Sequence, residues 1–175
     1  LALKSDGTFV AWGGNRDGQN CNGTLSSGSF PQPVKSLAGA LAVAGGGIHS
    51  LVLKPDGTVW ACGHNAEGQL GDGTNNYNPN PVQALGLSAV VAIAAGGTHS
   101  LALKSDGTVW AWGLNTEGQL GDGTNTSHNA PVQVSGLSGV VAIAAGGAAV
   151  VGAGEHSMAL KSDGTVLAWG SNTNG

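Results

Sequence analysis

The stretch LALKSDGTVWAW, residues 101–112, decides the fold. Large and small side chains alternate on both sides of its centre, which is typical of β-strands. Between them, Asp106 can accept hydrogen bonds from turn backbone groups, and Gly107 can take a positive φ without steric cost. The stretch therefore predicts a β-hairpin with strands over 99–104 and 109–112, and a turn-forming rather than a catalytic role for Asp106.

The same hairpin recurs along the chain. The motif Leu-Lys-Ser/Pro-Asp-Gly-Thr occupies 3–8, 53–58, 103–108 and 160–165, at spacings of 50, 50 and 57 residues. Aligning 51–97 with 101–147 gives 34 identities in 47 positions, so one structural unit is copied. We divide the single domain 1–175 into units 1–50, 51–100, 101–157 and an incomplete 158–175, with seven extra residues near 148–154.

The rest of each unit also predicts β-structure. Residues 113–124 are too rich in glycine for a helix and indicate a long structured loop. An edge strand is expected over 131–134, and the apolar run 140–145 predicts a strand covered on both faces. Four short strands without helices match one blade of an all-β propeller, and a solenoid of β-hairpins is the competing architecture.

Composition excludes several classes of function. Ten acidic against six basic residues give a net charge of −4, and the absence of a basic cluster disfavours nucleic-acid binding. The longest apolar run, 140–151, is shorter than the roughly 20 residues that cross a bilayer, so we predict no membrane insertion. The regularly spaced apolar residues argue against disorder.

The string LALKSDGTVWAWGLNTEGQLGDGT, residues 101–124, resembles the repeat of the regulator of chromosome condensation (RCC1) family. The resemblance implies a seven-bladed propeller whose members act by binding proteins: nucleotide exchange on a small GTPase, ultraviolet sensing in plants, or inhibition of secreted β-lactamases in bacteria. This chain departs from the pattern at 19–24, at Cys62 in place of a tryptophan, and at the insertion 148–154.

Seven copies of fifty residues need about 350 residues, so this chain holds about three and a half blades. Open blade edges expose apolar faces and unpaired strands. We therefore expect a segment of a longer chain, with a self-sufficient half-ring as the alternative.

The histidines at 49, 99 and 156 each precede a serine, and a His–Ser pair suggests a nucleophile with its base. Neighbouring strand residues point to opposite faces, and the sequence offers no third group to orient the imidazole. We predict a structural role in each blade, such as bonding a neighbouring backbone. No catalytic residue is assigned.

No metal or cofactor site is predicted either. Cys21 and Cys62 stand at non-equivalent places in their repeats, which indicates neither a disulfide framework nor a zinc site. The loops 72–75 and 122–125 loosely resemble calcium loops but lack their dense oxygen ligands. Glycine pairs before each histidine indicate close blade packing rather than phosphate binding. The tryptophans at repeat phase are expected in the core, with exposed binding anchors as the alternative: Trp12, Trp60, Trp110, Trp112 and Trp169.

The second and third units are nearly identical but diverge at 76–80 and 126–130. Rigid scaffolds that present variable loops are common in binding surfaces, and drift in unconstrained loops is the alternative. The candidate partner contacts are Tyr77, Asn78, Asn80, Ser127, His128 and Asn129.

The sequence thus predicts a non-enzymatic scaffold for protein–protein interaction, without a cofactor. Its partner is another, unidentified protein, and self-association through open blade edges is a further expectation. The alternatives are a nucleotide-exchange regulator of a small GTPase, an inhibitor of a secreted enzyme, and a carbohydrate-binding propeller. Low charge and Asn/Gly-rich loops favour an extracellular or cell-surface location over the cytoplasm.

Overall fold

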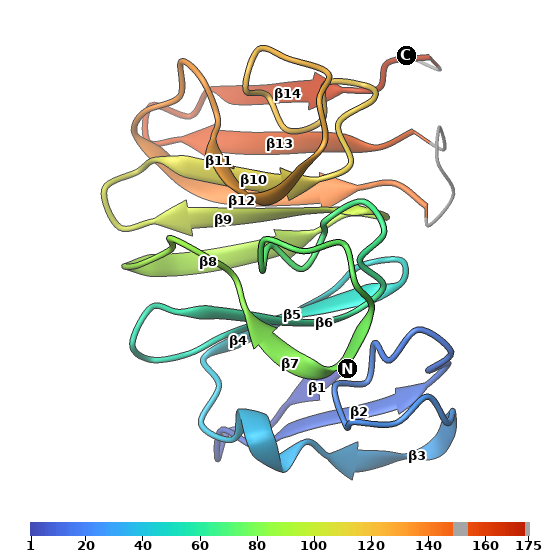
Figure 1. Ribbon diagram of the computed structural model, residues 1–175. Helices are drawn as coiled ribbons and strands as arrows, with labels where there is room; N and C mark the ends of the chain where they lie inside the picture. The colour runs from blue at the N-terminus through green and yellow to red at the C-terminus, as the bar shows by residue number, and fades with distance from the viewer. Residues whose placement is uncertain (149–153, 174–175) are drawn as a thin grey trace.

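The computed structural model describes residues 1–148 and 154–173, which form four antiparallel sheets that we call blades 1 to 4 (Figure 1). Blade 1 contains β1 (Ala2–Leu3), β2 (Phe9–Gly13) and β3 (Gly28–Pro33). Blade 2 contains β4 (Ala42–Gly45), β5 (His49–Leu53), β6 (Val59–Gly63) and β7 (Asn78–Gln83). Blade 3 contains β8 (Val90–Ala95), β9 (His99–Lys104), β10 (Val109–Gly113) and β11 (His128–Gln133), and blade 4 contains β12 (Val140–Gly146), β13 (His156–Lys161) and β14 (Val166–Gly170).

This architecture confirms the all-β fold of partial propeller blades. Strands follow one another in order across each sheet, as expected for consecutive antiparallel strands joined by turns and loops. One short 3₁₀ helix, Lys35–Leu37, connects blade 1 to blade 2. Blades 2, 3 and 4 each start at an apolar strand, so blade 2 takes residues from both of the sequence units 1–50 and 51–100. The division into those units stays a prediction.

The central hairpin forms as predicted. In blade 3, β9 pairs with β10 with Leu103 opposite Val109. The Asp106 carboxylate accepts hydrogen bonds from the Thr108 hydroxyl (2.6 Å) and backbone N–H (3.0 Å), and Gly107 has a φ of +79°. These two hydrogen bonds hold the pKa of Asp106 below its ordinary value. Asp106 is therefore a turn-former.

The last strand of each full blade is an edge strand, and proline keeps it from pairing further. Pro131 lies within β11, where it offers no N–H to another strand.

The pairing of β10 with β11 shifts register between Ala111 and Gly113. Gly113 has a φ of +102°, and a Cβ there would lie 2.6 Å from the Thr98 carbonyl oxygen, so only glycine fits.

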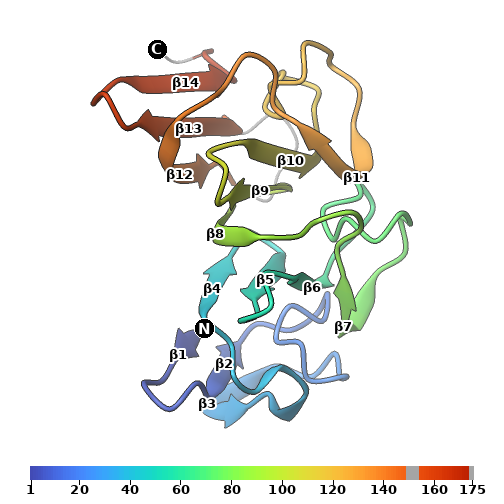
Figure 2. The same cartoon turned by 90° about the vertical axis from the view of Figure 1, so that its left-hand side faces the viewer.

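The blades stack face to face around an arc. Among the first strands, β4 contacts β8 and β8 contacts β12, and the outer strands β7 and β11 lie on the opposite side of the molecule (Figure 2). The glycine pairs before each histidine permit this approach, as expected: a Cβ on Gly46 would lie 2.6 Å from the Gly96 carbonyl oxygen of the next blade. Face-to-face stacking supports the propeller over the hairpin solenoid.

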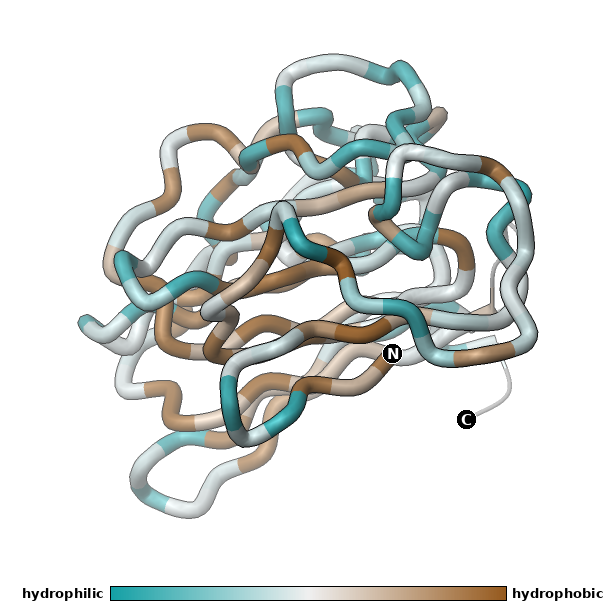
Figure 3. Tube along the Cα trace, turned by 90° about the horizontal axis from the view of Figure 1, so that it is seen from below, coloured by the Kyte–Doolittle hydropathy of each residue, from teal (hydrophilic) through white to brown (hydrophobic). Residues whose placement is uncertain are grey.

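The hydrophobic core lies between successive blades rather than within one. Leu51, Leu53 and Leu70 of blade 2 pack with Ala102 and Trp112 of blade 3. Hydrophobic residues accordingly follow the strands, and hydrophilic ones gather in the loops (Figure 3).

The tryptophan prediction holds in part. Trp112 is fully buried, and Trp60, Trp110 and Trp169 are partly buried. Trp12 is 40% exposed, so a core position is wrong for this residue. It occupies the face of blade 1 that no other described blade covers.

The prediction that the cysteines form no disulfide is wrong. Cys21, in the loop after β2, and Cys62, in β6, form a disulfide that joins blade 1 to blade 2, with their Cα atoms 5.3 Å apart. Their places in the repeat differ because the bond runs between neighbouring blades, where a loop of one unit meets a strand of the next.

The insertion near 148–154 lies largely outside the described residues. Within the described ranges, no helix has the length and hydrophobicity needed to cross a bilayer.

Candidate interaction surface

A buried asparagine organises each long loop. The Asn115 side chain is fully buried, and its Nδ2 amide donates hydrogen bonds to Asp122 Oδ1 (3.2 Å) and to the backbone oxygens of Thr124 (3.1 Å) and Thr126 (3.0 Å). Its Oδ1 accepts from the Leu120 backbone N–H (2.9 Å). One side chain thus fixes most of the loop backbone over 115–126.

The same geometry argues against calcium at this loop. The oxygens of Asp122 and Thr124 that a cation needs already face the N–H groups of Asn115. Among the described residues, no cluster of three or more His, Cys, Asp or Glu side chains is placed to hold a metal ion. Burial alone raises the pKa of Asp122, but hydrogen bonds from Thr124 and Asn115 outweigh it and hold this pKa below its ordinary value.

The long loop of one blade is bonded to the outer strand of the next blade. The Gly73 backbone N–H of blade 2 donates to the Asn129 carbonyl of blade 3 (2.9 Å), and Asn129 Nδ2 donates back to the Gly73 carbonyl (3.1 Å). At the preceding junction, the Gly23 N–H donates to the Pro79 carbonyl (3.0 Å). We call the loops 14–27, 64–77 and 114–127, together with the outer strands β3, β7 and β11, the loop band.

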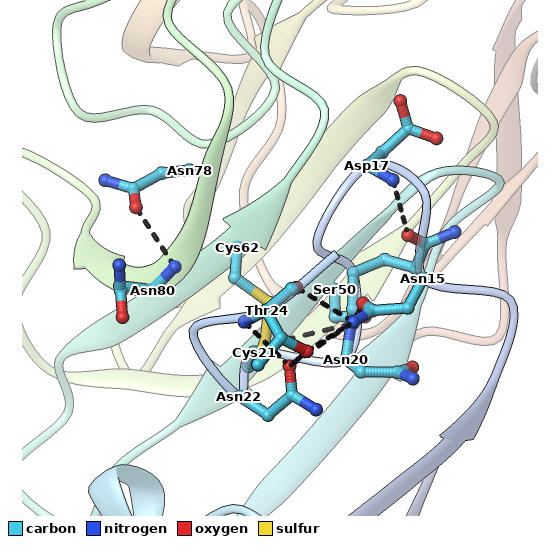
Figure 4. Close-up of a disulfide and its surroundings, with 11 residues drawn as sticks. Asn15, Asp17, Asn20, Cys21, Asn22, Thr24, Ser50, Cys62, Asn78 and Asn80 are labelled. Carbon is cyan, nitrogen blue, oxygen red and sulfur yellow. Dashed lines mark hydrogen bonds between the residues drawn. A yellow bond between two sulfur atoms is a disulfide. The ribbon is translucent and has the colours of Figure 1, made fainter. Parts of the chain in front are cut away.

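The predicted contacts of blade 2 differ in exposure. Tyr77 is 55% exposed, and its ring lies 4.3 Å, centroid to centroid, from that of His64. The Asn78 side chain accepts a hydrogen bond from the Asn80 backbone N–H (3.0 Å), and Asn80 is exposed (Figure 4). Tyr77 and Asn80 are thus available to a partner, while Asn78 shapes the start of β7.

The predicted contacts of blade 3 support the loop more than they face solvent. Ser127 Oγ accepts from the Asn115 backbone N–H (3.1 Å). His128 Nε2 lies 3.1 Å from Asp122 Oδ2, with the His128 side chain one third exposed. Asn129 bonds to the neighbouring loop as described above. All three are half-buried, so their contact with a partner stays a prediction.

Two exposed apolar residues of blade 1 escaped the sequence analysis. Leu25 is 59% exposed, and Phe30, on β3, is 74% exposed. They stand at the repeat phases of Asn75 and Asn80. The signal in the sequence is that apolar residues of the first unit stand where the second unit has asparagine.

The repeated histidines and serines join blades to each other. Ser100 Oγ donates to the Gln69 carbonyl of the preceding blade (2.9 Å) and therefore accepts from His49 Nε2 (2.9 Å). This hydrogen-bond pattern fixes the Nε2–H tautomer of His49. His and Ser of one pair do not meet, as expected, and the serine bonds a neighbouring backbone as predicted.

The expectation that no third group orients these histidines is wrong for His99. Its Nε2 lies 2.9 Å from Ser157 Oγ, and its Nδ1 lies 2.5 Å from Glu155 Oε2, while Thr98 Oγ1 donates to Glu155 Oε1 (2.9 Å). Ser157 Oγ donates to the Gln119 carbonyl (2.8 Å). The sequence hid this contact because Glu155 belongs to the next blade.

The order Ser157–His99–Glu155 resembles a hydrolase triad, but its surroundings oppose catalysis. All three side chains are fully buried. The Ser157 hydroxyl donates its proton to a backbone carbonyl. In a catalytic triad it would donate this proton to the imidazole, which acts as the general base. The cluster is therefore a buried hydrogen-bond network that joins blades 3 and 4.

Antiparallel sheets of three or four strands, stacked around an arc and joined by repeated polar contacts, define the class of the β-propellers. Family models described as "Regulator of chromosome condensation (RCC1) repeat" match residues 56–103 and 106–160, and a second RCC1 model matches 41–69 and 90–119. The chain belongs to the RCC1 repeat family. No curated protein matches it in sequence.

Solved structures show the same fold. Human WBSCR16 shares 28% identity over 98% of this chain and 46% of its own, with a TM-score of 0.81. Prp20p from Saccharomyces cerevisiae, described with its binding to Gsp1p and histones, shares 24% identity over 96% of this chain and 42% of its own, with a TM-score of 0.78. The chain thus spans less than half the length of these proteins.

Proposed function

We propose that the protein is a non-enzymatic scaffold that binds a partner protein through the loop band. The observation that carries the proposal is that hydrogen bonds that hold the long loops correspond in blades 2 and 3, while the residues after them differ. Asn65 and Asn115 make corresponding hydrogen bonds to Asp72 and Asp122 (both 3.2 Å), yet the residues that follow, 76–80 and 126–130, differ at every position.

The side chains on the loop band suit protein recognition. Tyr77 combines an apolar ring with a polar hydroxyl, and tyrosine is enriched among residues that dominate binding energy at interfaces. Its ring lies against His64, which limits its freedom before binding and so lowers the entropic cost of association. Leu25 and Phe30 add exposed apolar area on blade 1.

Nucleotide exchange on a small GTPase is the second candidate. Its support is membership of the RCC1 repeat family and the likeness to Prp20p, whose structure was described with its binding to Gsp1p. At 24% identity this likeness concerns the fold, and the chain covers 42% of Prp20p. We therefore place exchange below the scaffold role.

The test uses a photo-crosslinking amino acid at Tyr77, with the same residue at Ser162 in an exposed turn of blade 4 as the control. Cross-linking in the source cells is expected to give one defined adduct from position 77 and none from 162. The adduct is then purified and titrated with the unlabelled protein. Tyr77→Ala is expected to weaken binding at least tenfold.

The proposal is wrong if the purified partner binds the wild type and variants at Tyr77, Phe30 and His128 equally well. Exchange is tested separately, by release of a fluorescent nucleotide from small GTPases. Accelerated release by the wild type, lost on mutation of the loop band, replaces the scaffold role with an exchange function.

A further inference from the structure

Two of the three blade junctions share one tryptophan contact. Between blades 2 and 3, Trp112 Nε1 donates to the Gln69 carbonyl (2.8 Å). Its indole lies against Gly71, where a Cβ would come within 2.8 Å of Nε1. Between blades 3 and 4, Trp169 Nε1 donates to the Gln119 carbonyl (2.9 Å). A tryptophan on one blade thus fills space that a glycine on the preceding blade leaves open.

The junction between blades 1 and 2 changes both partners together. Cys62 stands at the repeat phase of Trp112, and Cys21 stands at the phase of Gly71. The two sulfur atoms are bonded, and the side chains are 0% and 1% exposed (Figure 4). The disulfide therefore occupies the same contact that tryptophan and glycine make at the other junctions.

Neither change fits alone. A side chain at the glycine position collides with the indole, as the 2.8 Å distance at Gly71 shows. Replacing the tryptophan alone with a smaller residue leaves a buried cavity where the indole was, and such a cavity destabilises a core. Cys21 also keeps the left-handed backbone of the glycine it replaces, with a φ of +57°, a conformation that costs energy for any residue with a Cβ. The junction is therefore filled without a collision only when both positions change together.

We propose that the Cys21–Cys62 disulfide is a covalent substitute for the tryptophan–glycine contact, so that the attachment of blade 1 to blade 2 depends on the redox state. Reduction by a dithiol proceeds in two exchanges. One thiolate attacks a cystine sulfur and forms a mixed disulfide, and the second thiolate then releases the other cysteine. The dithiol loses two electrons and two protons, and Cys21 and Cys62 each gain one of each.

The reduced junction is the weakest of the three. Two thiols fill less space than an indole and lack its N–H donor, so the Gln19 carbonyl keeps the bond from Ser50 Oγ (2.7 Å) but gains none from position 62. The loop that carries Cys21 also holds the Gly23 to Pro79 hydrogen bond of the loop band. Loss of the disulfide thus loosens the band where blades 1 and 2 meet.

Burial controls how the disulfide meets a reductant. A groove of about 560 Å³ runs beside the bond and is lined by Cys21, Asn22, Gly23 and Asn80 among others. The sulfur atoms lie beneath its surface, because both cysteines are buried. Reduction therefore requires a transient opening of the loop 14–27, and we expect it to be slow in the folded protein.

Amide hydrogen exchange, read by mass spectrometry, tests the proposal. The oxidised protein is compared with the same protein reduced by a dithiol, after thiol counting has confirmed two free thiols. Exchange over 14–27 is expected to accelerate on the order of a hundredfold on reduction, while exchange over 99–112 is unchanged. Equal exchange over 14–27 in the two states overturns the proposal.

Two double variants extend the test. Cys21→Gly with Cys62→Trp rebuilds the contact of the other junctions, and we expect it to protect 14–27 with or without reductant. Cys21→Ser with Cys62→Ser imitates the reduced junction and is expected to exchange fast in both conditions. If the Gly–Trp variant exchanges as fast as the Ser–Ser variant, with 99–112 protected in both, the equivalence of the two contacts is wrong. The reduced wild type supplies the same comparison if the Ser–Ser variant does not fold.

Discussion

Acidification should destabilise the protein through His49. This side chain is fully buried between blades 2 and 3, and burial, assisted by the charges of His99 and His64, lowers its pKa from 6.5 to about 3. In the unfolded chain the imidazole takes a proton below its ordinary pKa of 6.5, whereas in the folded protein it stays neutral down to about pH 3. The unfolded state therefore binds more protons between these values, and stability falls as the pH falls through this window.

The size of the effect follows from the shift. Each pH unit below 6.5 costs about 1.4 kcal/mol, so the loss at pH 5 is about 2 kcal/mol. The neutral imidazole contributes its full stability above pH 6.5, and the loss levels off below about pH 3.

The measurement is urea unfolding, followed by tryptophan fluorescence at pH 7.5, 6 and 5, of the wild type and of His49→Gln. The glutamine amide keeps an N–H donor for Ser100 Oγ but does not titrate. The wild type should be the more stable protein at pH 7.5, and the difference should shrink by about 2 kcal/mol at pH 5. Titration of other groups is common to both proteins and cancels. A difference that does not change with pH refutes the assignment of a buried neutral imidazole.

Two further predictions concern the blade junctions. Trp112→Phe removes the N–H donor to Gln69 and part of a buried ring, and should lower the free energy of unfolding by about 2 kcal/mol in urea titrations. The matched control Trp110→Phe should cost less, because Trp110 Nε1 has no hydrogen-bond partner among the described residues; an equal cost contradicts the reasoning. Glu155→Ala leaves His99 Nδ1 without its buried partner and should lower the thermal midpoint clearly more than Glu155→Gln, which keeps the side-chain volume and a hydrogen-bonding oxygen. Equal midpoints for the two Glu155 variants would show that a hydrogen-bonding oxygen at position 155 does not stabilise this junction.

The sequence predicted whatever one repeat unit determines by itself. Alternation around Asp106-Gly107 identified the hairpin because the strand period and the turn chemistry are local properties. The spacing of 50 identified the copies, and a long motif of the family identified the propeller. The sequence predicts a structured loop over 113–124, but it does not predict that the buried side-chain amide of Asn115 holds this loop.

Contacts between blades were not predicted because they depend on the angle and offset between neighbouring sheets. The Cys21–Cys62 bond joins two different phases of the repeat, so comparing equivalent positions made it appear unpaired. Glu155 meets His99 only because blade 4 stacks on blade 3, and the two residues are 56 positions apart. The exposure of Phe30 was not predictable in the same way, because an apolar residue in a strand pattern indicates burial unless its counterpart in the next unit, here Asn80, is polar.

The contact between Trp112 and Gln69 affects how such a protein can gain repeat units by duplication during evolution. The contact is head to tail, since blade 3 offers the Gln119 carbonyl to the next blade and Trp112 and Ser100 to the preceding one. A tandem duplication of one unit thus creates a new interface with both halves already present and needs no further mutation. The disulfide junction lacks this property, because its two cysteines arose in different units and a copy of either unit carries an unmatched thiol.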